Sequence, residues 1–525
     1  MTRPNFLLFI TDQHRADHLG AYGNTVVHTP NLDGLARRGW VADRCYVSSP
    51  VCMPNRASLL TGRPPSLHGV RHNGIPLSLQ ATTFVDVLRR AGWRTALIGK
   101  GHLQNMSGLP SAWPPAQRRL ALEARREPPG RYDQEWGPRW QQDPGCEMEL
   151  PFYGFDGVRL AIDHGDEVLG HYRRWLEREH PAVAALTGPG HALASDYALV
   201  AAGQAWRTRV PEECSTTRWI ADETILRLQE HARDGEPFFI QCSFPDPHHP
   251  FTPPGRYWDM YDPALIDLPA SFHGCTEPPP HVAALHRLRD AGKAVKSSPA
   301  AFACSEREAR EAIALNYGSI AHIDAEVGRV LGTLQRLGLD RDTVVIFTSD
   351  HGDYLGDHQL LLKTPIHYQS LIRAPLIWSD PQRPTASRSA DLHATIDLAP
   401  SILQRAGVPA FNGITGRCLP CVADADADAD APLRRRVVVE DEVQRMLFGF
   451  AAPPRLRTLV TPRWRMSVYL DATWGELYDL QDDPHECRNR WDDPGCVGLK
   501  SELLFELAQE LMAQGECSPY ASALA

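Results

Sequence analysis

The chain has 525 residues, a hydrophobic fraction of 43% and a net charge of −10. A chain of this length is expected to bury one large core and a smaller second unit. Its mild acidity, with short and mixed runs of charge, argues against nucleic acid as a partner.

The first predicted element is a buried strand at residues 5–10, which leads directly into Asp12 and Gln13. This apolar run is too short to cross a membrane, and it lacks the small-residue cleavage site of a secretory signal. The 12 cysteines form no dense disulfide framework in so long a chain. We therefore expect a cytoplasmic protein with no membrane partner. Cys418 and Cys421 form a C-x-x-C pair without a second pair at zinc-finger spacing, so we expect no redox or metal role for them.

The most informative segment surrounds Cys52, which is followed by Pro54, Arg56 and a helix-forming stretch that ends at Gly62. Pro54 suits the first turn of a helix, so Cys52 is expected at or just before a helix N-terminus. Unpaired backbone N–H groups and the positive end of the helix dipole favour an anion there. Arg56, about one turn further on, is placed to neutralise that anion. A buried structural cysteine before an ordinary helix is the alternative that this motif alone leaves open.

Strands and helices alternate along the chain up to about residue 400, and polar motifs follow the carboxyl ends of several strands, a pattern typical of α/β proteins. The predicted helices lie at residues 29–39, 83–92, 216–233 and 306–337. After the first strand, further strands are predicted at residues 94–98, 238–244, 343–348 and 375–378. We therefore predict an α/β fold.

Two long segments, at residues 104–150 and 250–300, interrupt this alternation. They are rich in proline and lack clear periodicity, which is typical of insertions that lie over a sheet edge and select the substrate. Residues 423–431 alternate Asp and Ala, and for this low-complexity stretch we expect a solvated loop without a metal site.

The C-terminal region has a different pattern, in which several short strands precede one helix. The predicted strands lie at residues 437–440, 455–460, 464–470 and 476–480, and the helix at residues 499–514. Strands followed by a helix indicate a small α+β unit. We therefore predict a catalytic domain at residues 1–422 and a smaller subdomain at residues 433–525.

Polar residues follow four of the predicted strands. They are Asp12 and Gln13 after the first strand, Lys100 and His102 after residues 94–98, His248 after residues 238–244, and Asp350 and His351 after residues 343–348. Each pair alone is a weak signal, because a polar residue after a buried strand is more often a turn or a cap. Their order and combination are specific.

Together with the Cys52 segment and Lys363, these residues resemble the sulfatase branch of the alkaline phosphatase superfamily, from near residue 5 to about residue 490. Residues 28–33 and 475–480 also resemble that branch. The resemblance implies an alkaline-phosphatase-like fold, with a large mixed sheet flanked by helices and a smaller C-terminal α+β unit. It also implies that a maturation enzyme oxidises Cys52 to formylglycine.

The resemblance further implies one divalent cation, bound by Asp12, Gln13, Asp350, His351 and formylglycine at position 52. Oxygen ligands with one imidazole suit Ca²⁺, Mg²⁺ or Mn²⁺ better than a metal that prefers thiolates. In the family's commonest pattern an acid stands at position 13 and asparagine at position 351. Gln13 and His351 depart from it, and both changes also occur in phosphonate monoester hydrolases that use Mn²⁺. The resemblance therefore leaves Ca²⁺ and Mn²⁺ open.

The implied mechanism begins when one hydroxyl of hydrated formylglycine, activated by the cation and Arg56, attacks sulfur or phosphorus. Lys100 would hold the non-bridging oxygens, and His248 or Lys363 would protonate the leaving oxygen. His102 would then take a proton from the second hydroxyl, which expels sulfate by C–O cleavage.

Several further residues have two interpretations. Asn73 is a candidate for binding the substrate, together with Lys100, His248 and Lys363, but a turn role for its Asn-Gly pair is equally compatible. His249, Asp353 and His358 are expected to lie outside the ligand set. The aromatic residues of the insertions could line a substrate pocket, although such residues more often anchor loops. They are Trp113, Trp136, Trp140, Tyr257 and Trp258.

Three functions remain to be compared. An arylsulfatase-like sulfuric ester hydrolase, acting on a small-molecule sulfate ester, is favoured because Lys100 and His102 match the sulfatase pattern. A phosphonate monoester or phosphodiester hydrolase, alone or as a second activity of the same site, is compatible with Gln13 and His351. A non-catalytic binding protein with an unmodified Cys52 is disfavoured by the complete metal set. The sequence does not name the leaving alcohol, and it leaves open whether identical chains associate through the Pro-rich insertions.

Overall fold

The computed structural model describes residues 3–112, 125–275, 277–384, 386–422, 434–445, 447 and 450–524. Trp113 and the Asp-Ala stretch at residues 423–431 lie outside the described residues, so the expectations for them stay predictions. Within the described part of the chain, no helix combines the length and the apolar character needed to cross a lipid bilayer.

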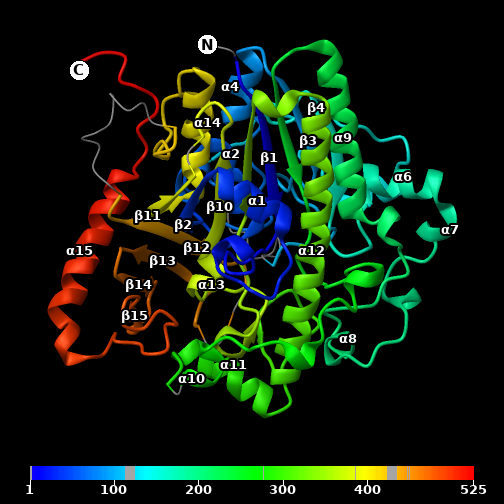
Figure 1. Cartoon of the computed structure of the whole chain (residues 1–525). Coiled ribbons are helices and arrows are strands. Elements are labelled where there is room, and N and C mark those ends of the chain that lie inside the picture. The colour runs from blue at the N-terminus through cyan, green and yellow to red at the C-terminus, as the bar shows by residue number, and fades with distance from the viewer. Residues whose placement is uncertain are drawn as a thin grey trace.

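A nine-stranded mixed sheet forms the centre of the molecule (Figure 1), with the strand order β11-β2-β10-β8-β1-β6-β3-β4-β5. β1 (Asn5–Thr11) lies between β8 (Thr343–Ser349) and β6 (Phe238–Ser243), and the three strands are parallel. All seven residues of β1 are buried, as expected for a parallel strand that is covered on both faces. The predicted α/β fold with a large mixed sheet is therefore confirmed.

The remaining strands of this sheet are β2 (Trp40–Tyr46), β3 (Arg94–Gly99), β4 (Gly157–Ile162), β5 (Leu169–Gly170), β10 (Arg373–Ser379) and β11 (Ser387–Ala394). The sequence predicted β3 and β10 but missed the two-residue strand β5 and, among the longer strands, β2, β4 and β11. These three longer strands contain charged residues, and the first half of β11 is largely exposed at the sheet edge, so they lack the continuous apolar runs of the central strands.

One face of the sheet is covered by α1 (Pro30–Arg38), α9 (Thr216–Asp234) and α12 (Glu306–Arg336). Their apolar side chains form one core cluster with Leu7 and Phe9 of β1. α12 is a single helix of 31 residues that begins with a complete capping box. Figure 1 shows that it runs along the length of the sheet.

The opposite face is covered by α2 (Cys52–Thr61), α4 (Phe84–Arg90) and α14 (Leu398–Ala406). Their side chains form a second core cluster with Phe6 and Leu8 of β1. Because successive residues of a strand point to opposite faces, β1 contributes to both clusters. The central sheet is thus fixed between two apolar layers, which is what gives the strand ends a rigid position.

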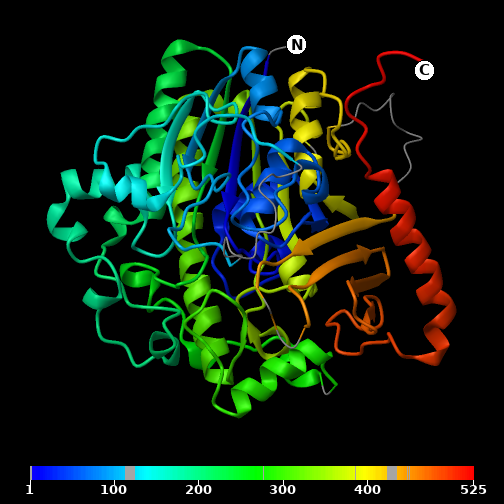
Figure 2. The same cartoon turned by 180° about the vertical axis from the view of Figure 1, so that it is seen from behind.

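Four strands form the separate antiparallel sheet of the C-terminal region, namely β12 (Val437–Glu442), β13 (Arg455–Val460), β14 (Trp464–Tyr469) and β15 (Gly475–Asp479). α15 (Val497–Ala513) packs on one face of this sheet and lies at the outer edge of the molecule (Figure 2). Val437 and Val439 face the other way, into a cluster with residues of the catalytic part. The small α+β unit is confirmed, whereas its boundary at residue 433 stays a prediction.

The short elements connect these layers. They are α3 (Pro65–His68), α5 (Gly137–Gln142), α6 (His171–Glu179), α7 (Pro181–Ala184), α8 (Ala198–Ala201), α10 (Ser271–Gly274), α11 (Pro280–Asp290), α13 (Gln369–Ile372), and the paired strands β7 (Phe302–Ala303) and β9 (Leu360–Leu361).

Part of the insertion at residues 250–300 packs in the same apolar cluster as the C-terminal sheet, and its predicted place over the sheet edge stays a prediction. Val282 and Leu285 of α11 lie in this cluster with Val437 of β12 and with Leu392 of the edge strand β11. A disulfide between Cys275 and Cys487 links the insertion to the C-terminal unit. It is the one disulfide among the described residues, so the expectation of no dense framework holds for that part of the chain.

Candidate active site

The carboxyl ends of β1 and β8 lie side by side, because the two strands are parallel and pair Thr11 with Ser349. The next residue of each segment is a buried aspartate, Asp12 after β1 and Asp350 after β8. The backbone N–H of Asp350 donates to Thr11 O at 3.1 Å, and the backbone N–H of Gln13 donates to Asp350 Oδ1 at 3.0 Å. Three of the predicted metal ligands therefore meet at this edge of the sheet.

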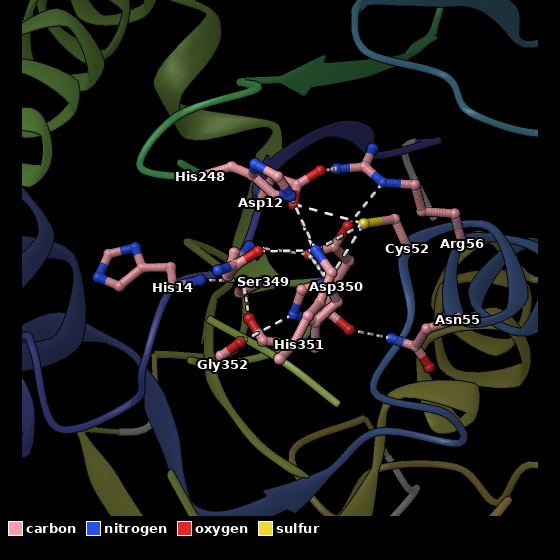
Figure 3. Close-up of polar contacts among 12 residues, drawn as sticks. Asp12, His14, Cys52, Asn55, Arg56, His248, Ser349, Asp350, His351 and Gly352 are labelled. Atoms are coloured by element: carbon pink, nitrogen blue, oxygen red, sulfur yellow. Dashed lines mark hydrogen bonds and ion pairs between the residues drawn. The ribbon is translucent and has the colours of Figure 1, made fainter. Parts of the chain in front are cut away.

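Cys52 is the first residue of α2, and its side chain is buried beside these strand ends. Its Sγ atom lies 3.2 Å from His351 Nε2, 3.6 Å from Asp12 Oδ1 and 3.4 Å from Lys363 Nζ. Figure 3 shows Cys52, Asp12 and His351 pointing toward one another, whereas His14 points away from them. Burial raises the pKa of the Cys52 thiol, and the negative charge of Asp12 raises it further.

Arg56 connects the ends of several strands. Its Nε donates to Asp350 Oδ2 at 2.8 Å, and its Nη2 lies 3.2 Å from Asp12 Oδ2. Its Nη1 donates to the backbone oxygen of Lys100 at 3.0 Å and to Ser243 Oγ at 2.9 Å. The buried guanidinium thus orients both aspartates and balances part of their charge.

The ligand atoms of Asp12, Cys52, Asp350 and His351 all lie within 4.8 Å of one another. His351 Nδ1 lies 2.8 Å from Gly352 O, so the proton is assigned to Nδ1 and the lone pair of Nε2 faces the other three groups. Burial acts to raise the pKa of Asp12, but the charges of nearby cationic groups, with Lys100 first, hold it well below its ordinary value. Two carboxylates and an available imidazole nitrogen in a buried cluster fit a divalent cation.

Gln13 contributes an amide beside this cluster. Its Oε1 accepts a hydrogen bond from Lys363 Nζ at 2.7 Å, and its Nε2 donates to Asp353 and lies 3.2 Å from His249 Nδ1. His249 and Asp353 therefore contact a predicted ligand, and their place outside the ligand set stays a prediction. His358 stacks on Tyr368 with ring centroids 3.5 Å apart.

The predicted lysines approach the cluster from two sides. Lys100 Nζ forms a fully buried ion pair with Asp12 Oδ2. Lys363 Nζ lies 2.8 Å from His248 Nε2, and that imidazole nitrogen is 4.0 Å from Asp12 Oδ1. Burial lowers the pKa of His248 well below its ordinary value, and the neighbouring His164 and Lys363 lower it further. The imidazole of His248 is therefore uncharged at neutral pH.

His102 is buried, and its backbone has a φ of 55°, in the left-handed region. Its Nδ1 has no hydrogen-bond partner among the described residues. Burial lowers its pKa well below the ordinary value, and the charges of Lys100 and Arg56 lower it further. An uncharged imidazole with an unpaired nitrogen beside these cations has the chemistry of a proton acceptor.

The side chain of Asn73 supports α2. Its Oδ1 accepts a hydrogen bond from the backbone N–H of Met53 at 3.1 Å, in the first turn of the helix that begins with Cys52. Gln444, from the loop after β12, donates to Asn73 O. The C-terminal unit therefore reaches the segment that supports the Cys52 helix. The expectation that Asn73 binds the substrate stays a prediction.

The aromatic residues of the insertions mostly anchor loops. Trp258 is buried and stacks on Tyr197 at 5.4 Å, and Tyr257 stacks on His322 at 4.6 Å. Trp140 is buried beneath the guanidinium of Arg174. These contacts agree with the alternative that aromatic residues hold long loops in place.

The sequence missed two residues of the site, His164 and Glu135. His164 follows β4, and its Nε2 lies 2.6 Å from Lys100 Nζ. Glu135 lies in the insertion at residues 104–150 and accepts hydrogen bonds from the backbone of residues 102–104. An Asp-His pair after the apolar residues of β4 was the available signal for His164, whereas nothing in the aperiodic insertion pointed to Glu135.

Comparisons with known proteins agree with this geometry. Residues 4–408 match the family model described as Sulfatase, and residues 356–513 match the model described as N-sulphoglucosamine sulphohydrolase, C-terminal. The chain is 28% identical over 433 residues to the arylsulfatase of Clostridium perfringens, which covers 79% of this chain and 78% of the relative. It is 29% identical over 521 residues to the multifunctional alkaline phosphatase superfamily protein PehA of Trinickia caryophylli, with coverage of 95% and 93%.

Among solved structures, the phosphonate monoester hydrolase of Agrobacterium radiobacter is similar over nearly the whole fold. The TM-score is 0.73 at 25% sequence identity, and the match covers 97% of this chain and 96% of that chain. The family match from residue 4 includes the segments that carry Asp12, Cys52, Lys100, His248 and Asp350.

Proposed function

Because this chain belongs to the sulfatase family and is a sulfuric ester hydrolase, we propose that it hydrolyses sulfate monoesters through a formylglycine at position 52 and one divalent cation. The observation that carries the proposal is the convergence of Asp12, Asp350 and His351 on the side chain of Cys52, with their ligand atoms within 4.8 Å of one another. A structural cysteine in an apolar core would have no need of such neighbours.

The cation would be held by Asp12, Gln13, Asp350 and His351, together with the oxidised residue at position 52. When bound, it would supply positive charge that favours the ionised form of a hydroxyl group and neutralises the ester oxygens. Both Ca²⁺ and Mn²⁺ accept this set, and the imidazole of His351 favours Mn²⁺. Arg56 already contacts both aspartates, so the cation would complete an arrangement whose orientation the protein fixes by itself.

Formylglycine, made from Cys52 by a maturation enzyme, would supply two geminal hydroxyl groups once hydrated, one to form the ester and one to release it. The encoded thiol is poorly suited to this chemistry, because burial and Asp12 raise its pKa and so disfavour the nucleophilic thiolate. Its place at the start of α2 directs the side chain at position 52 toward the carboxylates and Lys363.

The two lysines would act on different oxygen atoms of the ester. Lys100 Nζ, paired with Asp12, would bind a non-bridging oxygen, and this contact would strengthen as charge develops there. Lys363 Nζ, 2.8 Å from His248 Nε2 and 3.4 Å from Cys52 Sγ, would give the proton to the leaving oxygen. His248 would accept a hydrogen bond from that ammonium and aim it, since its own imidazole is uncharged. His102 would accept the proton that releases sulfate.

The second candidate is hydrolysis of phosphonate monoesters or phosphodiesters at the same site. Gln13 and His351 favour it, together with the likeness to the phosphonate monoester hydrolase of Agrobacterium radiobacter. Lys100 and His102 favour the sulfate ester. The two substrates carry similar charge, so one site can serve both, and we propose the phosphonate reaction as the weaker activity.

A parallel assay tests the proposal. Enzyme loaded with Mn²⁺ or with Ca²⁺ is assayed with an aryl sulfate and with an aryl phosphonate monoester. The same assays are made on Cys52→Ala and on the matched control Cys517→Ala, which alters an exposed cysteine. We expect kcat/KM to be higher for the sulfate and to be lost in Cys52→Ala only. The mass of the tryptic peptide that contains residue 52 reports whether the thiol has become an aldehyde. Activity that survives in Cys52→Ala would exclude the formylglycine mechanism.

A further inference from the structure

His164 lies between two groups of the proposed catalytic machinery, although it is neither in the sequence motifs nor among the proposed cation ligands Asp12, Gln13, Asp350 and His351. Its Nε2 is 2.6 Å from Lys100 Nζ. Its ring is stacked on the ring of His248, with centroids 3.6 Å apart and planes inclined by 15°. Resting on the proposed function, we propose that His164 is a positioning residue that fixes the ammonium of Lys100 and the ring plane of His248.

The contact with Lys100 assigns the tautomer of His164. An ammonium group has only protons to give, so Nε2 must accept and the ring proton must lie on Nδ1. Nδ1 lies 3.0 Å from Asp163 Oδ1, which accepts that proton's hydrogen bond. Asp163, His164 and Lys100 thus form a chain in which a carboxylate orients an imidazole and the imidazole orients a cation.

This chain gives Lys100 a second partner besides Asp12. Without His164, the ammonium would be drawn onto Asp12 alone, because these two side chains are the hydrogen-bond acceptors of Lys100 Nζ among the residues that the structure describes. Held between a carboxylate and a neutral nitrogen, the ammonium keeps part of its charge available to an incoming sulfate oxygen. His164 therefore acts on the substrate through Lys100.

The second contact of His164 restrains His248. His248 also stacks on His249 on its other side, with centroids 4.1 Å apart and planes inclined by 23°. A ring held between two parallel rings cannot turn out of its plane without losing both contacts. Its Nε2 edge therefore stays directed at Lys363, 2.8 Å away.

The loop that carries His164 is itself held firmly. Gly165 has a φ of +66°, and a Cβ at that position would lie 3.1 Å from Pro250 and 3.3 Å from Trp206. The carboxylate of Asp166 accepts hydrogen bonds from Trp206 Nε1 at 3.0 Å and from the backbone N–H of Gly188 at 3.0 Å. The side chain of His164 is only 13% exposed. A restrained, nearly buried ring is suited to hold two neighbours in place.

Two substitutions separate the two contacts. His164→Phe keeps a ring that can stack on His248 but removes the acceptor for Lys100. His164→Gln keeps an acceptor at nearly the position of Nε2 but removes the stacking ring. We expect His164→Phe to raise KM about 10-fold for every aryl sulfate. We expect His164→Gln to lower kcat for phenyl sulfate and for 4-nitrophenyl sulfate, and the loss to be about 10-fold larger for phenyl sulfate. The poorer leaving group depends more on a correctly aimed proton donor.

A binding measurement keeps this test independent of turnover. In a Cys52→Ala background, calorimetric titration with inorganic sulfate should show weaker binding for His164→Phe and unchanged binding for His164→Gln. If the wild-type enzyme lacks sulfatase activity, the proposed function fails, while this titration still decides the contact between His164 and Lys100. Equal behaviour of the two variants, or losses that follow only a drop in Tm, would overturn the positioning role. His273→Phe, at a 66% exposed side chain, controls for an added phenyl ring.

Discussion

Asp353 accepts a hydrogen bond from the side-chain amide of Gln13, whose oxygen accepts one from Lys363 Nζ at 2.7 Å. The other oxygen of Asp353 accepts hydrogen bonds from the backbone N–H groups of Leu355 at 2.9 Å and Leu362 at 3.0 Å. A carboxylate that only accepts must face the NH₂ group of Gln13. The amide oxygen, which is the end that a cation would bind, is therefore the end that points away from Asp353.

This relationship predicts that Asp353→Asn weakens divalent metal binding without removing any metal ligand. Asparagine can offer its own NH₂ group to Gln13, and the Gln13 amide would then turn its oxygen away from the site. Loss of such a supporting contact typically costs about 10- to 100-fold in metal affinity. Calorimetric titration of metal-free protein with Mn²⁺ measures it directly. Asp357→Asn, four residues on in the same loop and paired with Arg15 instead, is the matched control. Equal affinities for both variants would contradict the prediction.

Glu135 supports the loop that follows β3. Its carboxylate accepts three backbone hydrogen bonds, from His102 at 2.5 Å, Leu103 at 2.6 Å and Gln104 at 2.6 Å. Glu135→Gln would set an NH₂ group against one or more of these N–H groups, and an unsatisfied buried donor costs about 1–3 kcal/mol. We expect a lower Tm and a fall in kcat, because His102 is displaced with the loop. Glu149→Gln, at a 62% exposed side chain of the same insertion, should change neither quantity.

The sequence alone predicted the candidate site residues that directly follow a continuous apolar strand. Asp12 and Asp350 follow β1 and β8, whose residues are all buried, so the local pattern and the position of the proposed ligands coincide. Cys52 was singled out because the run with Pro54 at the first turn of a helix and Arg56 resembles the sulfatase signature. Five strands of the central sheet, the long helix α12 and the small C-terminal sheet followed from the apolar patterns, whereas the extent of the large mixed sheet was implied by the resemblance.

Other parts depend on contacts between distant segments, which no local pattern encodes. His164 follows β4, a strand interrupted by the exposed Arg159. Its role can be inferred only from its contact with Lys100, which is 64 residues away in sequence. Glu135 lies in an aperiodic insertion and acts on the backbone of a different segment. Val282 and Leu285 of α11 share an apolar cluster with residues of the C-terminal sheet, and such packing between distant segments cannot be predicted from composition.

The C-terminal sheet contains a buried arginine whose loss should be costly. Arg465 is fully buried, lies 3.0 Å from Glu476 Oε2, and pairs with the buried carboxylate of Glu486. Removing it leaves two carboxylates without a cation, which typically destabilises a protein by about 3–5 kcal/mol. We expect Arg465→Met to lower the denaturant midpoint strongly. Arg94→Met removes an ion pair with Glu236 whose side chains are 61% and 49% exposed, so it should lower the midpoint much less. If both variants lowered the free energy of unfolding by similar amounts, burial of the ion pairs of Arg465 would not make them more important for stability than an exposed pair.

His68 predicts a loss of stability in acid. Its Nε2 lies 2.8 Å from Ser58 Oγ and its Nδ1 accepts from the backbone N–H of Val70 at 3.1 Å. Burial, followed by the charge of Arg63, lowers its pKa from 6.5 to about 3. Between these two pH values, His68 is protonated in the unfolded chain but not in the folded chain. The free energy of unfolding is therefore not reduced by His68 above pH 6.5, and it decreases as the pH falls toward 3.

At about pH 4.5, His68 alone should lower the free energy of unfolding by about 3 kcal/mol. Urea unfolding of the wild type and His68→Gln, each at about pH 7.5 and about pH 4.5, should show a smaller pH-dependent loss in the variant. Equal losses in the two proteins would mean that His68 takes up its proton without unfolding.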